Sequence, residues 1–427
     1  MMYLMFGLMV VLLILSFPMM VPLVLAPLVT VAVYYPKIDA VTMAQQILGG
    51  VRPMSLVAVP MFIFAADIIS SGQAARRLTD LVLCFLGHIK GGLAITTAAA
   101  CTAFGAVSGS CQATVVAIGG PMRPRLIEDG YGEGFSTALL INAAGIALLI
   151  PPSIGMIIYG VVTGSSVGEM FIAGIGPGFL VFMLFSLYCY YDAWRRKIPI
   201  HPKSSWKERG QALKKAVMAL GFPIIILGGI YTGLTSPTEA SAIAVFYAFV
   251  VEVVIYRNLK LKDIYRIALS TGLVTGVVFI LLAMGAVFSW VVGFARIPDQ
   301  ILPSILGEAP SMVSLLVVIS IAYLIACMFV DSIVAIMILS PIFHPKVIAL
   351  GIDPVLVGIL VTMQVAIGAV TPPFGCNIFT AMAIYKQPYG SAVSKVWGFL
   401  FLYVVSVALI IAFPQIALFL RDMAFSK

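Results

Sequence analysis

A chain of 427 residues, 62% hydrophobic and only 10% charged, is not an ordinary soluble domain, in which about 25% of residues carry charge. The composition predicts an all-α polytopic membrane protein with no soluble domain left over. Six cysteines lie singly in apolar surroundings without the spacing of a metal site, so we expect them to be small packing residues.

Apolar runs long enough to cross a bilayer, about 20 residues each, recur along the whole chain. In the first half we expect spans at roughly 3–34 with a break at Pro18, 55–71, 92–106, 134–150, 154–173 and 174–191. In the second half we expect them at roughly 214–233, 238–256, 266–295, 312–330, 353–370, 374–385 and 396–420. The first run has no basic residue before it, since the first is Lys37, so we expect a retained span and not a secretory signal.

The net charge of +8 is concentrated in the joint between the two halves. Eight basic residues lie between Tyr191 and Lys215, opposed only by Asp192 and Glu208. The positive-inside rule therefore predicts that this joint lies in the cytoplasm. Because positive loops beside lipid are the default in such chains, we expect no nucleic-acid partner.

Two apolar regions are interrupted by Gly, Ser and Pro in the same order. The first holds Ser108-Gly109-Ser110, Gly120-Pro121 and Pro151-Pro152, and the second holds Asp331-Ser332, Ser340-Pro341 and Pro372-Pro373. Pro121 and Pro341 lie 220 positions apart, and Pro151 and Pro372 lie 221 apart, a spacing that two unrelated breaks would not share. Irregular backbone survives in lipid only where it lines an enclosed cavity, and matched breaks in two halves indicate a transport site.

The repeat divides the chain into residues 1–200 and 201–427, for which we expect inverted topology if an odd number of crossings separates equivalent points. The first repeat is expected to hold a re-entrant helical hairpin near 93–121 and a Pro-broken helix near 134–173, and the second a hairpin near 312–341 and a broken helix near 353–385. Amphipathic segments at 76–90 and about 292–306 are expected to connect a scaffold to this core, with ordinary surface connectors as the alternative.

The two Pro-Pro steps remove backbone donors, so we expect free carbonyls around residues 144–150 and 368–371. With the hydroxyls and the carboxylate at the hairpin tips, these carbonyls form a set of hard oxygen ligands that suits a small cation such as sodium. The helix N-termini beyond each break would attract an anion. The alternative is a pair of proline kinks used only for packing.

Four acidic residues fall within or at the edge of apolar segments: Asp67, Glu169, Glu239 and Asp331. A carboxylate at the bilayer centre costs on the order of 3 kcal/mol, so each is a functional candidate. Asp331 is the strongest because it lies at a hairpin tip. Glu239 follows Pro237, where a carboxylate is expected to cap a helix.

Signatures of enzymes are weak. The segment Gly164–Gly168 matches the nucleophile-elbow pattern around Ser166, but that motif requires a preceding strand and a placed histidine. An intramembrane serine hydrolase is therefore a remote alternative. The sequence has no GxxxxGK[ST] phosphate loop, so we expect no ATP-driven step and no enzymatic activity in this chain.

Five motifs resemble, in their order, the large membrane subunit of tripartite ATP-independent periplasmic (TRAP) transporters: Pro60–Ala66, Ser108-Gly109-Ser110 with Gly120-Pro121, Ile150–Ser153, Ser236–Ala240 and Thr371–Gly375. The resemblance covers almost the whole chain. It implies a bacterial inner-membrane protein that imports an organic acid with sodium, by an elevator motion of the broken-helix core against a scaffold. It also implies two partners, a small four-helix membrane subunit on a separate chain and a soluble periplasmic binding protein that delivers the substrate.

Carried over motif by motif, the resemblance also implies which residues bind. One sodium site would consist of Ser108, Ser110, Gly145 and Ile150, and a second of Asp331, Gly368, Val370 and Thr371. The substrate would bind between the tips, at Ser108, Gly109, Ser153, Ser332 and Pro372. Sodium is the co-transported ion, and the resemblance implies no organic cofactor and no other metal.

The resemblance overall favours the sialic acid (N-acetylneuraminate) type of this family. C4-dicarboxylates are the alternative substrate, and a self-sufficient sodium/anion symporter without a binding protein is the alternative machinery. Two sodium ions moving with one monovalent carboxylate would carry positive charge inward, so we expect uptake to be electrogenic.

Overall fold

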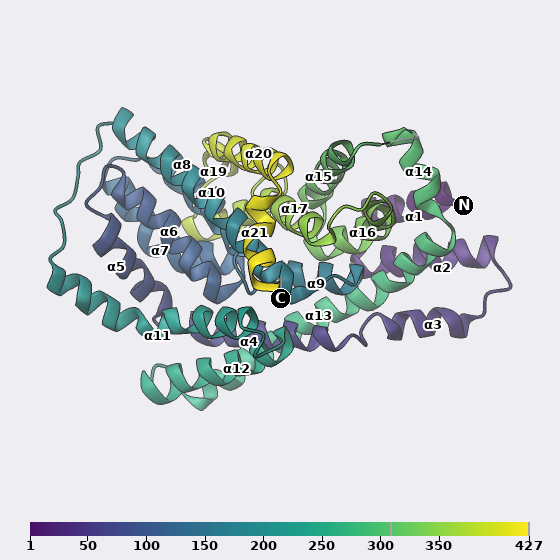
Figure 1. Ribbon diagram of the computed structural model, residues 1–427, viewed down its shortest axis with the longest axis horizontal. Coiled ribbons are helices and arrows are strands. Elements are labelled where there is room, and N and C mark those ends of the chain that lie inside the picture. The colour runs from purple at the N-terminus through teal and green to yellow at the C-terminus, as the bar shows by residue number, and fades with distance from the viewer. Residues whose placement is uncertain (308–309, 426–427) are drawn as a thin grey trace.

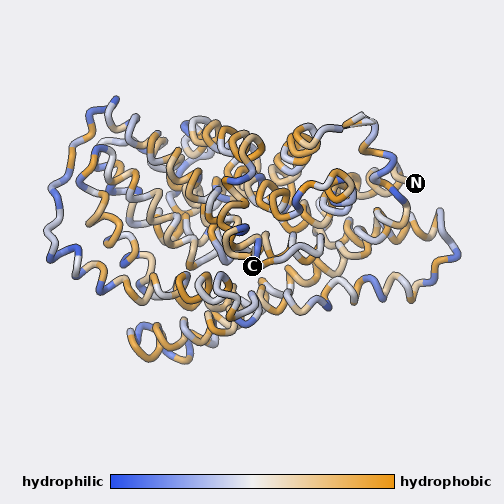
Figure 2. The backbone as a smooth tube through the Cα atoms, in the orientation of Figure 1, coloured by the Kyte–Doolittle hydropathy of each residue, from blue (hydrophilic) through white to orange (hydrophobic). Residues whose placement is uncertain are grey.

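The structure is a computed structural model that describes residues 1–307 and 310–425. Every regular element in those ranges is a helix, as expected where backbone groups have no water to bond with. Six helices are long and apolar enough to cross a membrane, or up to eight if each of two bent pairs forms one span. Hydrophobic residues cover most of the backbone tube, and hydrophilic residues gather at joints and helix ends (Figure 2).

The first half of the chain runs from α1 to α10 (Figure 1). The first apolar run is broken near Pro18, as predicted, into α1 (Met2–Ile14) and α2 (Met20–Tyr34). Next come α3 (Ala40–Gly49), η1 (Met54–Val57), α4 (Ala58–Ser70) and the amphipathic α5 (Ala74–Leu86). The half ends with α6 (Gly92–Ser108), α7 (Cys111–Glu128), α8 (Glu133–Gly145), η2 (Ile146–Leu148), α9 (Ile154–Thr163) and α10 (Val167–Arg195).

The second half begins with the long helices α11 (Trp206–Tyr231), α12 (Pro237–Phe249), its π-helical extension η3 (Val250–Ile255), and α13 (Leu261–Phe294). A short helix α14 (Ile297–Leu306) leads to α15 (Met312–Phe329) and α16 (Ser332–Ala349). The chain continues with α17 (Pro354–Gly368), α18 (Cys376–Tyr385), α19 (Tyr389–Val393), α20 (Val396–Ala412) and α21 (Gln415–Phe425).

The two halves pack through exchanged partners. Helices α6 and α7 form one hairpin, and α15 and α16 form another. In each half the outgoing limb packs on the helix before its own Pro-Pro step, α6 on α8 and α15 on α17. The return limbs cross over, so that α7 contacts α18 and α16 contacts α9. The outer helices exchange in the same way, α2 packing on α13 and α4 on α12, which interlocks the halves.

Three predicted boundaries differ from the structure, and two of them are the ends of the return limbs. The return limbs do not end at Pro121 and Pro341: α7 continues to Glu128 and α16 to Ala349. An interior proline removes one helical hydrogen bond and bends the helix, which limbs packed against neighbours can accommodate.

The other difference concerns the first broken helix, which was expected to extend to residue 173. It ends at Thr163, where Gly164 adopts a φ of +72° and Ser166 caps α10 by accepting a hydrogen bond from the Glu169 N–H (3.3 Å). Pro177, near the expected boundary, lies inside α10. The N-cap at Ser166 therefore sets the boundary between α9 and α10, although the apolar stretch continues past it.

A buried arginine connects the basic joint to α5. Arg209 is only 7% exposed, and its Nε donates to the Cys84 carbonyl at 3.2 Å. Its guanidinium lies 5.2 Å from the ring centre of Phe85 and 5.0 Å from that of Trp206. The positive charge complements the C-terminal end of the α5 dipole. Helix α5 therefore lies on the same side of the molecule as the basic joint.

Candidate transport site

The tip of the first hairpin touches the first Pro-Pro step. Helix α6 ends at Ser108, and Gly109 adopts a φ of +58°. Ser110 caps α7, because its hydroxyl accepts a hydrogen bond from the Ala113 N–H at 3.3 Å. A Cβ atom at Gly109 would overlap the carbonyl oxygen of Pro152. Ser108 Oγ and Thr114 Oγ1 share a hydrogen bond of 3.2 Å. The tip thus brings a cluster of hydroxyls against the break.

Polar atoms at this first break lack partners. Ser153 and Asn142 are fully buried, yet Ser153 Oγ and Asn142 Oδ1 have no hydrogen-bond partner among the described residues. In the same part of the chain, no backbone N–H donates to the carbonyls of Ile150 and Pro152. A buried polar atom without a partner costs about 1–3 kcal/mol, so such atoms usually mark a place where a ligand or water bonds. Three of these acceptors, the Ser153 hydroxyl and the carbonyls of Ile150 and Pro152, belong to the break itself, and oxygens of this kind suit a hard cation.

The second break is more fully bonded than the sequence predicted. The carbonyls of Gly368, Ala369 and Thr371 accept backbone N–H groups at 3.2, 2.9 and 3.0 Å, because the chain folds back through residues 371–377. Of the four carbonyls expected to be free, only that of Val370 accepts no backbone N–H from the described residues. The Thr371 hydroxyl donates to Ile367 O at 2.6 Å. A carbonyl has a second lone pair, so these bonds leave coordination of a cation open.

The tip of the second hairpin approaches the second break. Asp331 caps α16 by accepting the Ile333 N–H at 2.9 Å. Asp331 is exposed, and no basic side chain in the described ranges forms an ion pair with its carboxylate. A Cβ at Gly368 would lie 2.5 Å from Cys327 Cβ on α15, and the rings of Phe329 and Phe374 are 5.8 Å apart. Ser332 and Pro372 lie beside these contacts and are partly exposed.

The two breaks meet inside the molecule. Asn377 Nδ2 donates to the Ile141 carbonyl at 3.0 Å, which joins α18 to α8. The hydroxyl of Tyr403 on α20 donates to the Asn142 carbonyl at 2.9 Å. A Cβ at Gly145 would lie 3.3 Å from the Ala366 carbonyl. These contacts join α8 of the first half to α17, α18 and α20 of the second. Asn142, Asn377 and Tyr403 were not predicted as site residues, although a lone amide inside an apolar run is a signal that could have found the two asparagines.

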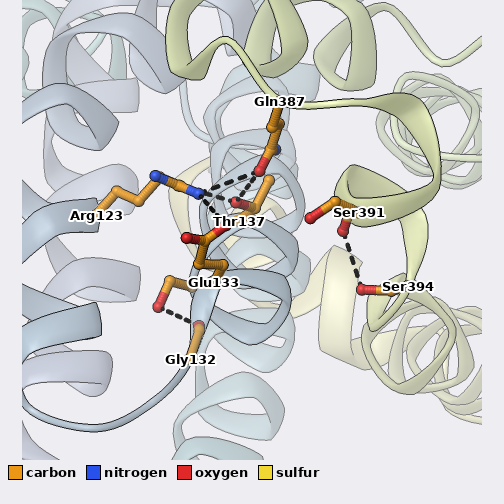
Figure 3. A network of polar contacts seen from close by, with 8 residues as sticks. Arg123, Gly132, Glu133, Thr137, Gln387, Ser391 and Ser394 are labelled. Atoms are coloured by element: carbon orange, nitrogen blue, oxygen red, sulfur yellow. Dashed lines mark hydrogen bonds and ion pairs between the residues drawn. The ribbon is translucent and has the colours of Figure 1, made fainter.

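A further polar cluster ties the first hairpin to its neighbours (Figure 3). Arg123 on α7 donates to Thr137 Oγ1 at 3.0 Å and to Gln387 Oε1 at 3.2 Å, and pairs with Glu133 at 3.4 Å. Its guanidinium also lies 5.1 Å from the Tyr385 ring centre. The Arg123 side chain is only 14% exposed and joins α7 to α8 and to the segment after α18.

Three of the four acidic candidates have side-chain partners among the described residues, whereas Asp331 accepts only the backbone N–H of Ile333. Glu239 forms the predicted cap, its Oε2 accepting from the Ser236 N–H at 2.7 Å. Glu169 pairs with Arg421 at 3.2 Å, and Arg421 also pairs with Asp353 at 2.7 Å. Asp67 accepts a hydrogen bond of 3.0 Å from Thr271. Asp331 is left as the candidate for ion binding.

The nucleophile-elbow interpretation of Ser166 is wrong. The segment before it is the helix α9, where the motif needs a strand. The Ser166 hydroxyl caps α10.

Comparisons with known proteins agree with this architecture. A family model described as the DctM component of tripartite ATP-independent periplasmic transporters matches residues 6–416. The chain is 55% identical to the ectoine TRAP transporter large permease protein TeaC of Halomonas elongata, with 97% of each chain covered. It is 56% identical, with 98% of each chain covered, to the ectoine/5-hydroxyectoine TRAP transporter large permease protein UehC of Ruegeria pomeroyi.

More distant matches include a C4-dicarboxylate TRAP transporter large permease protein of Pseudomonas aeruginosa, 36% identical with 86% of each chain covered. Among solved structures, the YdaH transporter of Alcanivorax borkumensis shares the fold, with a TM-score of 0.59, 15% identity and 87% of each chain covered. MtrF of Neisseria gonorrhoeae also shares it, with a TM-score of 0.56, 14% identity and 87% of this chain and 83% of that chain covered.

These relatives correct one expectation. The two at 55% and 56% identity are named for ectoine, which does not support the sialic acid type. They confirm the expected non-enzymatic role, because they are permease subunits.

Proposed function

Because this chain belongs to the DctM family of TRAP transporters, as its large inner-membrane permease subunit, we propose that it imports ectoine or 5-hydroxyectoine. The observation that carries the substrate is the identity of 55–56% to two ectoine permeases over nearly the whole chain. The dicarboxylate permease is 36% identical over 86% of the chain. Ectoine is a cyclic amidine with a carboxylate, hence a zwitterion at neutral pH.

The import is coupled to sodium in this proposal. Support comes from the first break, where the Ser153 hydroxyl has no partner and the carbonyls of Ile150 and Pro152 accept no backbone N–H among the described residues. The hydroxyls of the first hairpin tip approach the same break. Such a set matches the oxygen ligands that a sodium ion takes in other carriers. Asp331, with Val370 and Thr371 close to the second tip, supplies the second proposed site.

The proposed mechanism is an elevator motion of two inverted repeats. Support comes from the recurring order of hairpin and broken helix, and from the exchanged packing of α7 on α18 and α16 on α9. In this proposal the interlocked hairpins and broken helices move as one body, and α1 to α4 with α11 to α13 form the scaffold. A small membrane subunit and a periplasmic binding protein complete the transporter.

The test is uptake of radiolabelled ectoine into proteoliposomes that hold this chain and its small subunit, with the binding protein outside. Uptake that needs all three proteins and a sodium gradient is the expected result. Asp331→Asn and Ser110→Ala should raise the half-saturating sodium concentration, and Ser166→Ala should leave it unchanged. Absence of ectoine uptake, with uptake of a C4-dicarboxylate through its own binding protein, would refute the substrate. Uptake by the membrane chain alone would refute the tripartite machinery.

A further inference from the structure

A cavity of about 410 Å³ separates α5 from the return limb α7. From α5 it is lined by Arg76, Thr79 and Asp80, and from α7 by Ala117, Pro121 and Arg125. Its volume falls within the range of about 300–1,000 Å³ typical of small-molecule sites. Sodium binding does not need a space of this size, so the cavity is a candidate for an organic ligand.

The charged groups of this cavity are of both signs. Arg125 and Asp80 come from opposite walls, and they form no ion pair within 4.0 Å in the described chain. Asp80 meets only the exposed Arg76 on its own helix, at 4.0 Å. The buried hydroxyl of Ser70, at the end of α4, also lines the cavity and has no partner among the described residues. A guanidinium, a carboxylate and a hydroxyl around one space match a zwitterion.

The second half repeats this arrangement. A smaller cavity, about 220 Å³, lies between α14 and the return limb α16 and is lined by Asp299 and Lys346. Asp80 and Asp299 are 219 positions apart, and Arg125 and Lys346 are 221 apart, which is the spacing of the repeat. Each half therefore places an acid on the short helix and a base on the return limb. Figure 1 shows the two pairs of helices at opposite ends of the molecule.

The larger cavity lies on the side of the molecule that holds the basic joint. Helix α5 is bonded to Arg209 beside the basic joint, which the positive-inside rule assigns to the cytoplasm. On the other side, α16 packs directly on the scaffold helix α13, where Ser289 Oγ donates to Met337 O at 3.2 Å and Gly285 contacts Met337.

The cavity lines the same helix that leads away from the hairpin tip. Its three lining residues on α7 recur every fourth position, so they share one side of that helix. Ala117 comes seven residues after Ser110, so the cavity begins about 10 Å from the tip along α7.

We propose that the cavity between α5 and α7 is a cytoplasmic transit site for the zwitterionic substrate. Arg125 binds the carboxylate and Asp80 binds the cationic amidinium. The cavity between α14 and α16, with Lys346 and Asp299, serves in the same way on the periplasmic side when the moving body shifts. This site rests on the proposed function and adds a second place of recognition to it.

The test separates the two sides of the membrane. Proteoliposomes are loaded with radiolabelled ectoine at varied concentration, and efflux is measured with excess unliganded binding protein outside. Uptake from outside is measured in parallel. The internal ectoine concentration that half-saturates efflux reports binding at the cytoplasmic side of the permease. The external concentration that half-saturates uptake reports binding by the binding protein.

Arg125→Gln and Asp80→Asn should each raise the half-saturating internal ectoine concentration about tenfold, the loss of one partly exposed charge-assisted hydrogen bond. Both should leave the external value within about twofold. Lys207→Gln and Glu128→Gln, which change exposed charges outside the cavity, should alter neither value. Arg125→Lys keeps the charge and should show a smaller rise than Arg125→Gln, which separates loss of binding from misfolding.

Two results would overturn the transit site while the wild type still carries ectoine. One is an unchanged internal half-saturation in Arg125→Gln and Asp80→Asn that elute as the wild type in size-exclusion chromatography. The other is restored wild-type efflux in the double variant Arg125→Asp with Asp80→Arg, which would identify the two side chains as a latch that pairs on closure. A wild type that moves no ectoine in either direction would overturn the proposed substrate, and this site with it.

Discussion

Replacing Gly109 by alanine tests the contact that assembles the first half of the site. Gly109 holds a φ of +58°, and its Cα lies against the Pro152 carbonyl. A left-handed alanine costs about 1–2 kcal/mol. The added methyl group would also overlap the carbonyl oxygen, and overpacking of this kind costs about 1–3 kcal/mol. The sum is about 2–5 kcal/mol, which the hairpin would relieve by moving its tip away from the break.

Gly164→Ala is the matched control, because Gly164 has a φ of +72° and no atom within 4 Å of an added Cβ. It should show only the backbone cost of about 1–2 kcal/mol. Thermal unfolding in detergent and sodium-dependent ectoine uptake are measured on both variants. Gly109→Ala should be the less stable of the two and should lose most of its uptake, while Gly164→Ala keeps it. Equal stability and equal uptake in the two variants would refute the role of the Pro152 contact.

Three further substitutions test contacts around this core. Tyr403→Phe should lower the stability to unfolding by about 1 kcal/mol, because the buried Asn142 carbonyl loses its hydrogen bond, and an unchanged unfolding temperature would contradict that bond. Arg421→Ala should cost about 1–3 kcal/mol, since two partly buried carboxylates lose their partner, while the exposed Arg195→Ala should be nearly neutral; equal unfolding temperatures would argue against the pairing. Arg123→Lys keeps the charge but not the fork that joins α7 to α8 and the segment after α18, so it should slow uptake several-fold, and wild-type uptake would speak against that joint.

The positions of both breaks could be predicted because proline acts locally. Pro151-Pro152 and Pro372-Pro373 interrupt helices wherever the chain places them, so both breaks are where the sequence indicated. The cap at Glu239 followed from its position after Pro237.

At the first break, the carbonyls of Ala144 and Ile146 were expected to be free but accept backbone N–H groups. The prediction of free carbonyls also failed for most of the second break. Residues 371–377 fold back and donate backbone N–H groups to the carbonyls of Gly368, Ala369 and Thr371. The local effect of a proline on its own helix does not predict such a fold-back.

Sequence by itself determined the membrane class and the positions of the two Pro-Pro breaks, because hydropathy, charge and proline content express their effects within a few residues. Only the tertiary structure decided which of those segments meet. Asn377 bonds Ile141, Arg421 neutralises Glu169, and Arg125 faces Asp80 across a cavity. The first two of these pairs lie more than 200 positions apart, and all three depend on how packed helices are placed, which local propensity does not specify.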